Sequence, residues 1–191
     1  MEKNTPTGGG VPTGRNSGEP TYFDGDGHTV TGLWVESTDD YTGLFSNYST
    51  GEISNLTVRI AEGKKVKGGD YTGGLIGRNA NGKIENCAVY GKVEGTLHVG
   101  GIAGIVEHSN QTSLNFEGTV STNASNAFAG GIVGYSPSTL GTSTFNRCEA
   151  IATVNATGTA SCVGGVAGAI YGGTMEKCHA ETSLTVTGAD S

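Results

Sequence analysis

A short glycine-rich segment recurs along the chain, and this recurrence constrains the fold more than any other feature of the sequence. Its copies read YTGLFS at 41–46, YTGGLIG at 71–77, HVGGIAG at 98–104, FAGGIVG at 128–134 and CVGGVAG at 162–168. The closing glycines Gly77, Gly104, Gly134 and Gly168 are 27, 30 and 34 residues apart. A period near 30 residues indicates a stack of similar units joined by loops of different length.

A second marker follows each glycine segment at a short distance. It reads ISNL at 53–56, IENC at 84–87, SLNF at 113–116, FNRC at 145–148 and MEKC at 175–178. Stretches of alternating polar and apolar residues come next, as in 148–154, and such alternation is typical of strands. The 34 glycines among 191 residues, with many Thr, Ser, Asn and Val, oppose helix. The sequence therefore predicts an all-β chain, a parallel β-solenoid of about five rungs with a period near 30 residues.

The markers predict which residues face the interior. Two columns of inward residues are expected, one of them Leu56, Cys87, Phe116, Cys148 and Cys178, the other Ile53, Ile84, Ser113, Phe145 and Met175. Asn55, Asn86 and Asn115 precede the first column and are expected to form an amide ladder. The cysteines are interpreted as buried free thiols, because an unpaired cysteine behaves as a small apolar residue. Cys148 and Cys178, on adjacent rungs, are the pair near enough for a disulfide.

The repeated GGLIG, GGIAG, GGIVG and GGVAG blocks, each followed by an I-x-N-C type strand, resemble the GLUG-motif repeats of bacterial cell-surface adhesin-like proteins. Similar repeats occur in IgA1-specific metallopeptidases. The resemblance covers about residues 21 to 188 and implies a right-handed parallel β-helix on the outside of a bacterium, with an adhesive or spacer role. It does not carry metallopeptidase activity over, because the chain has no H-E-x-x-H and its four histidines lack ligand spacing.

An aromatic column precedes the glycine segments and is the candidate binding surface. Tyr41, Tyr71 and His98 begin it, and Phe128 and Cys162 continue it. If the rings faced solvent they would offer a stacking platform for sugars. The loss of polarity at Phe128 and Cys162 favours the other interpretation, in which the column packs inward.

Three further groups have a plain structural explanation beside a chemical one. Asp24-Gly25-Asp26-Gly27-His28 is interpreted as a glycine-rich turn, with an incomplete calcium loop as the alternative. Lys64, Lys65 and Lys67 are interpreted as a solvated insertion, with a small role toward an acidic partner as the alternative. Glu117 and Glu149 on neighbouring rungs could act in a polysaccharide-cleaving enzyme, but surface charge pairing is favoured. We expect no catalytic, metal-binding or cofactor-binding residues.

The chain is expected to form one solenoid domain over 21–191, preceded by a flexible polar linker or loose cap at 1–20. No apolar run is long enough to cross a membrane, and the net charge of −7 disfavours nucleic acid. The predicted function is a non-enzymatic extracellular module that binds host or microbial glycans, glycoproteins or matrix, or acts as a spacer. The alternative is a carbohydrate-active β-helical enzyme such as a polysaccharide lyase or hydrolase. We expect a monomer on the cell surface, continued by further domains of a larger protein.

Overall fold

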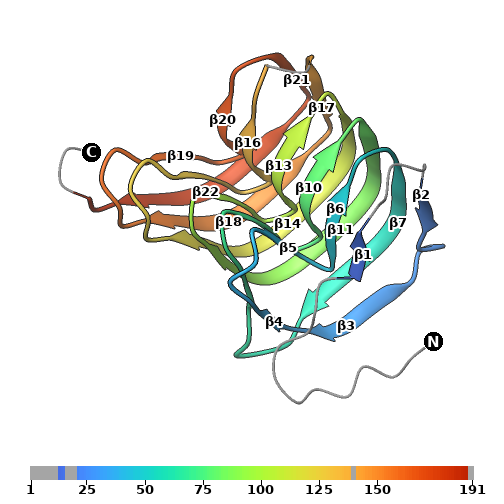
Figure 1. Cartoon of the computed structure of the whole chain (residues 1–191), viewed down its shortest axis with the longest axis horizontal. Helices are drawn as coiled ribbons and strands as arrows, with labels where there is room; N and C mark the ends of the chain where they lie inside the picture. Colours follow the sequence, from blue (N-terminus) through green and yellow to red (C-terminus); the bar gives the residue numbers. More distant parts are fainter. Residues whose placement is uncertain (1–12, 16–20, 139–140, 189–191) are drawn as a thin grey trace.

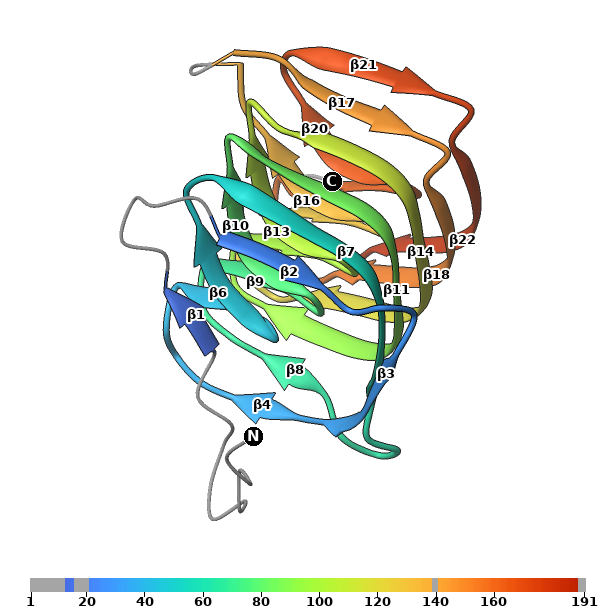
Figure 2. The same cartoon turned by 90° about the vertical axis from the view of Figure 1, so that its right-hand side faces the viewer.

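The computed structural model describes residues 13–15, 21–138 and 141–188, and every regular element in these ranges is a β-strand. Every strand pair is parallel, and strands of successive rungs lie side by side in the order of the sequence (Figures 1 and 2). This arrangement is a β-solenoid of about five turns, so the predicted fold is confirmed. The described ranges hold no helix long and apolar enough to cross a membrane.

Three sheets run along the stack. The five-stranded sheet contains β5 (Tyr41–Thr42), β9 (Tyr71–Gly73), β12 (His98–Gly100), β15 (Phe128–Gly130) and β19 (Cys162–Gly164). The six-stranded sheet contains β1 (Thr13–Arg15), β6 (Phe45–Tyr48), β10 (Ile76–Ala80), β13 (Ala103–Glu107), β16 (Val133–Ser136) and β20 (Ala167–Ile170). The predicted linker at 1–20 lies outside the described residues, except for the three residues of β1, which pair with β6.

The third sheet has eleven strands and includes the longest ones. They are β2 (Thr21–Asp24), β3 (Thr29–Leu33), β4 (Val35–Glu36), β7 (Gly51–Ile60), β8 (Val66–Lys67), β11 (Gly82–Gly95), β14 (Asn110–Thr122), β17 (Ser143–Asn146), β18 (Glu149–Ala156), β21 (Gly173–Glu176) and β22 (His179–Val186). One rung therefore runs through the five-stranded, the six-stranded and the eleven-stranded sheet in turn.

The register between rungs reproduces the spacing of the glycine segments. Tyr71 is opposite His98, His98 is opposite Phe128, and Phe128 is opposite Cys162, which are steps of 27, 30 and 34 residues. Apart from a register shift between Thr31 and Leu33, where β3 pairs with β7, length differences between rungs are absorbed between the paired strands, so the sheets stay aligned. The repeat alone thus predicts this part of the register.

The third rung of the eleven-stranded sheet differs from the predicted alignment by two residues. Ile84 is opposite Gln111 and Cys87 is opposite Leu114, so the predicted members Ser113 and Phe116 of the inward columns are wrong. Phe116 is nevertheless fully buried, opposite Val89. A shift of two residues returns every side chain to the same face of a strand, and burial patterns therefore cannot detect it.

The chain bends at one position of each marker, where the backbone adopts a left-handed conformation. The residues there are Asn55, Asn86, Ser113, Arg147 and Lys177, with φ between 52° and 54°. Asparagine tolerates this conformation better than other residues that have a side chain. The Asn86 amide donates to Asn55 Oδ1 at 2.8 Å, and Asn55 donates to Asp24 Oδ1 at 3.0 Å. The predicted ladder therefore exists for Asn55 and Asn86, whereas Asn115 is opposite Ala88 and outside it.

The interior is a set of aliphatic columns one residue wide. Val66, Val93, Val120 and Val154 follow one another in register and are at most 1% exposed. The side chains of the last described rung are more exposed than those of the rung beneath it. Leu184, in register with Val154, is 47% exposed, and Met175, in register with Phe145, is 45% exposed. The core therefore becomes thin toward β21 and β22.

Candidate functional site

The aromatic residues singled out in the sequence form a continuous ladder on the five-stranded sheet. The ring centroids of Tyr41 and Tyr71 are 5.1 Å apart and those of Tyr71 and His98 are 4.8 Å apart, with interplanar angles of 13° and 8°. Phe128 continues the ladder at 5.6 Å from His98. The fixed register of β5, β9, β12 and β15 places these rings above one another, so the structure brings the predicted residues together.

The ladder faces away from the core, which makes the favoured inward interpretation wrong. Thr72, Val99 and Ala129 alternate with the aromatic residues along their strands and are completely buried, whereas Tyr71, His98 and Phe128 are only half-buried. The inward interpretation was based on the apolar residues Phe128 and Cys162, which suggested a column packed in the core. Phe128 is covered by other rings rather than by core residues, and Cys162 is exposed.

Two further tyrosines extend the ladder, Tyr135 on β16 of the six-stranded sheet and Tyr171 directly after β20 of the same sheet. The Tyr135 ring on β16 stacks on Phe128 at 5.1 Å and lies 5.0 Å from His98. The exposed Tyr171 ring contacts Tyr135 edge-on at 5.7 Å. Neither residue was predicted from the sequence, although each follows its glycine segment closely.

Stacking determines what the ladder can offer to a ligand. A sugar packs its apolar face on the face of an aromatic ring, but the faces of Tyr71 and His98 are covered by their neighbours. The inner members therefore present edges and polar atoms. Burial raises the pKa of the Tyr71 and Tyr135 hydroxyls, so both remain neutral hydrogen-bonding groups at physiological pH. Burial also lowers the pKa of His98, which Asp70 only partly offsets.

The Asp24 to His28 segment forms a tight turn. Its backbone has positive φ at Asp26 and Gly27, and Asp24 Oδ1 accepts a hydrogen bond from the Asp26 N–H at 2.9 Å. Asn55 donates to the same oxygen and, together with the Asp26 N–H, lowers the pKa of Asp24. The carboxylate is thus already engaged in holding the turn to the next rung. Among the described residues, no three acidic, histidine or cysteine side chains converge as a metal site.

Glu117 and Glu149 do not form a stacked pair of carboxylates. Glu149 is opposite Asn115, and Glu117 is opposite Ile151. The two glutamates are therefore displaced by two residues along neighbouring strands, and the predicted adjacency is wrong. The cause is again the two-residue shift of the third rung, because the predicted alignment placed Glu117 in the column of Glu149.

The cysteines are unlinked in the structure and differ in environment. Cys87 and Cys148 are buried, and burial raises the pKa of their thiols to about 11 and about 12. Cys178 is partly exposed, and Cys162 is exposed, so the expectation of buried thiols holds for only two of the four. Cys148 and Cys178 do lie on adjacent rungs, as predicted.

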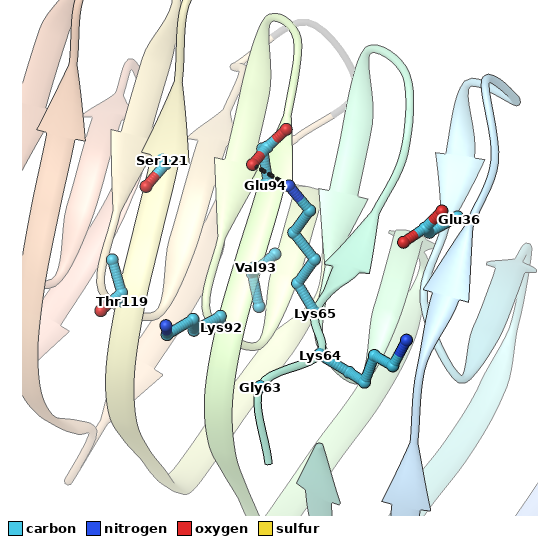
Figure 3. Close-up of a pocket in the computed structure, with 9 residues that line it drawn as sticks. All are labelled: Glu36, Gly63, Lys64, Lys65, Lys92, Val93, Glu94, Thr119 and Ser121. Carbon is cyan, nitrogen blue, oxygen red and sulfur yellow. Dashed lines mark hydrogen bonds and ion pairs between the residues drawn. The ribbon is translucent and has the colours of Figure 1, made fainter. Parts of the chain in front are cut away.

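A groove of about 380 Å³ lies on the outer side of the eleven-stranded sheet, beside the loop that joins β7 and β8 (Figure 3). Its lining consists of Glu36, Gly63, Lys64, Lys65, Lys92, Val93, Glu94, Thr119 and Ser121. Lys65 and Lys67 both bind Glu94, with Nζ to carboxylate distances of 2.6 and 3.1 Å. The hydrogen bond from Lys65, and to a smaller extent that from Lys67, lowers the pKa of Glu94.

The sequence singles out only two of the nine lining residues, Lys64 and Lys65, and not Lys92, Thr119 or Ser121. A signal was available: Lys65-Val66-Lys67 and Lys92-Val93-Glu94 are similar tripeptides 27 residues apart, the same distance that separates Gly77 from Gly104. Equal offsets in a solenoid place two segments in the same column, as the pairing of β8 with β11 shows.

Comparison with known proteins agrees with the repeat and the fold. Residues 68–94 match the GLUG motif, which confirms the resemblance found in the sequence. Over 103 residues, or 51% of the chain, the sequence is 39% identical to halomucin of Haloquadratum walsbyi, and the chain spans only 1% of that protein's length. The structure is similar to that of an immunoglobulin A1 protease-like protein from Bacteroides ovatus, with a TM-score of 0.57. That alignment covers 86% of this chain and 62% of the other at 18% identity, a likeness of fold alone.

Proposed function

We propose that this GLUG-repeat solenoid is a non-enzymatic module of an extracellular surface protein, where it binds glycans, glycoproteins or matrix, or acts as a spacer. The observation that carries the proposal is the stack of in-register rungs whose outward columns bear polar and aromatic groups. The match to the GLUG motif and the sequence similarity to halomucin support an extracellular location. The long parallel stack suits both tasks, because it extends a surface while keeping side chains at fixed spacing.

The alternative of a carbohydrate-active enzyme has less support. Hydrolysis of a glycosidic bond commonly needs two carboxyl groups at a defined separation on either side of the bond. The two glutamates considered for that role lie on neighbouring strands two residues out of register, and neither lines the groove described above. We therefore propose binding or spacing rather than catalysis.

The test is an array of polysaccharides and host glycoproteins probed with the protein. Each well is scored for retained protein and for newly released sugar ends. Retention without release supports an adhesive module, and retention nowhere supports a spacer. Release of sugar ends would contradict the proposal and favour the enzyme.

A further inference from the structure

We propose that the groove between the β7–β8 loop and strands β11 and β14 binds the acidic group of an anionic saccharide, and that the adjoining sheet face receives the neighbouring sugars. This inference rests on the proposed function, because it names the ligand class and the surface of an adhesive module. The acidic group is a carboxylate or a sulfate, which share the negative charge and the oxygen acceptors that ammonium groups recognise.

The charge of the groove is opposite to that of the protein. Its lining contains three lysines, Lys64, Lys65 and Lys92, and two glutamates, Glu36 and Glu94. Lys67, which does not line the groove, also binds Glu94. The chain as a whole has a net charge of −7. A local excess of positive charge in such a protein concentrates anions at one place on its surface.

Two of these lysines remain available to a ligand. Glu94 already binds Lys65 and Lys67, whereas the Lys92 side chain is exposed and makes no ion pair or hydrogen bond with any of the described residues. Figure 3 shows Lys92 extended toward Thr119, away from the pair formed by Lys65 and Glu94. The Lys64 ammonium lies over the Trp34 ring, 5.1 Å from its centroid. In Figure 3 the Lys64 and Lys92 side chains extend to opposite sides of the groove, Lys64 toward Glu36 and Lys92 toward Thr119. An anion at either side would therefore meet a cation that forms no ion pair with any of the described residues.

A polar track leads from the groove along the sheet. Lys92, Thr119, Thr153 and Ser183 are in register in one outward column. Glu94, Ser121, Asn155 and Thr185 are in register in the next outward column. The buried Val93, Val120 and Val154 lie between these columns and hold them apart. Each rung past β11 thus presents a pair of hydroxyl or amide groups, repeated about every 4.8 Å.

This combination fits a saccharide better than a peptide or a nucleic acid. A peptide ligand is usually anchored by apolar side chains in pockets, and both columns are polar in these rungs. A nucleic acid needs a larger cationic footprint than two available lysines. A sugar chain has hydroxyls along its length, which match a track of hydroxyl and amide groups, and an acidic substituent would match the cations at its end.

The chain contains a built-in reporter for the groove. Trp34 is the single tryptophan of the sequence, and Lys64, which covers its ring, also lines the groove. Binding of an anion by Lys64 would change the environment of the indole. Tryptophan fluorescence therefore reports on the surroundings of the Trp34 ring, to which the Lys64 ammonium belongs.

The experiment titrates the protein with oligogalacturonate, with its neutral methyl ester, with sulfated dextran and with unmodified dextran, and follows Trp34 fluorescence. We expect a saturable change with one or both anionic probes and none with their neutral counterparts. The two anionic arms distinguish a carboxylate from a sulfate. Lys92→Gln should weaken binding about fivefold, as expected for loss of one exposed charge contact. Raising the ionic strength should weaken binding further.

Lys177→Gln is the matched control, because it removes one exposed charge on the last rung, far from the groove in sequence. It should leave the titration unchanged. Equal binding of the neutral and anionic probes, or an unchanged affinity of Lys92→Gln, would overturn the inference. If the protein were then still retained on glycans of the array, the proposed adhesive function would be supported and only the proposed binding site would be contradicted. The absence of any titration by the anionic probes would also overturn the inference.

Discussion

Gly101 lies where two rungs and a core ring meet. A Cβ atom at this position would touch the carbonyl oxygen of Gly131 on the next rung and the ring of Phe116. The carbonyl belongs to a hydrogen-bonded rung and cannot withdraw without breaking the stack. The absence of a side chain is thus required by packing, independently of backbone conformation.

Gly101→Ala should therefore destabilise the protein by about 3 kcal/mol, the range seen for overpacked cores. The control is Gly63→Ala in the β7–β8 loop, where a Cβ meets nothing within 4 Å and only the positive φ of 70° costs about 1 kcal/mol. Urea unfolding of both variants gives the comparison. A smaller loss for Gly101→Ala than for Gly63→Ala would refute the packing argument.

Gln111 is the polar member of an apolar column. It lies between Ile84 and Phe145, it is 1% exposed, and neither its amide nitrogen nor its amide oxygen has a hydrogen-bond partner among the described residues. A buried amide without partners lowers stability, because its hydration is lost and nothing replaces it.

Gln111→Leu should consequently raise the free energy of unfolding by about 1–2 kcal/mol. The reverse change one rung away, Ile84→Gln, should lower it by a similar or larger amount. Thermal unfolding followed by circular dichroism measures both. A melting temperature of Gln111→Leu at or below that of the wild type would show that the amide is satisfied in solution.

The aromatic ladder of the five-stranded sheet couples the stability of the folded protein to pH through His98. Burial lowers the pKa of His98 in the folded protein below its ordinary value of about 6.5. As the pH falls below that value, the unfolded chain takes up a proton that the folded chain still excludes, so the folded state loses stability. Above pH 6.5 the imidazole is neutral in both states and this effect vanishes.

His98→Phe should reduce the loss of stability between pH 7.5 and pH 5.5, because phenylalanine keeps the stack and does not titrate. The exposed His179 is the control, and His179→Gln should keep the dependence of the wild type. Urea unfolding at each pH gives the free energies. Identical pH profiles for the wild type and His98→Phe would contradict the assignment.

The sheets illustrate what the sequence could and could not predict. The glycine segments predict the pairing of β9, β12, β15 and β19, because the repeat itself specifies which residues are opposite. In β14 the segment that aligns with IENC is QTSL, whereas the sequence predicts SLNF, two residues later. Both segments have the same alternation of polar and apolar residues, and only the 27-residue offset between rungs distinguishes them. The exposure of the aromatic ladder was missed for a different reason. Rings that cover one another on the outside of a sheet tolerate phenylalanine as well as a core does.

At the scale of the whole molecule, register predicts which deletions the fold tolerates. Removing residues 71–97 joins Asp70 to His98, and His98 then takes the place of Tyr71 opposite Tyr41. The shortened chain should unfold cooperatively with a moderately lower melting temperature, because stability in a stacked repeat protein is close to a sum over rungs and interfaces.

Removing only residues 71–84 is the matched control, because it cuts a rung in the middle and puts the following strands out of register. This variant should lose its cooperative transition. Circular dichroism and calorimetry of the two deletions test the prediction. If both shortened chains melted alike, rung register would not be what holds the stack together.

The stacking of parallel rungs gives the molecule a mechanical direction. The hydrogen bonds between rungs run along the stack, so a pull along that axis loads one interface between rungs at a time. Detaching a rung of 27 to 34 residues releases roughly 100 Å of slack. Under tension such a chain would yield in steps, one coil at a time, and take up a sudden load as extension before the rest of the stack is strained.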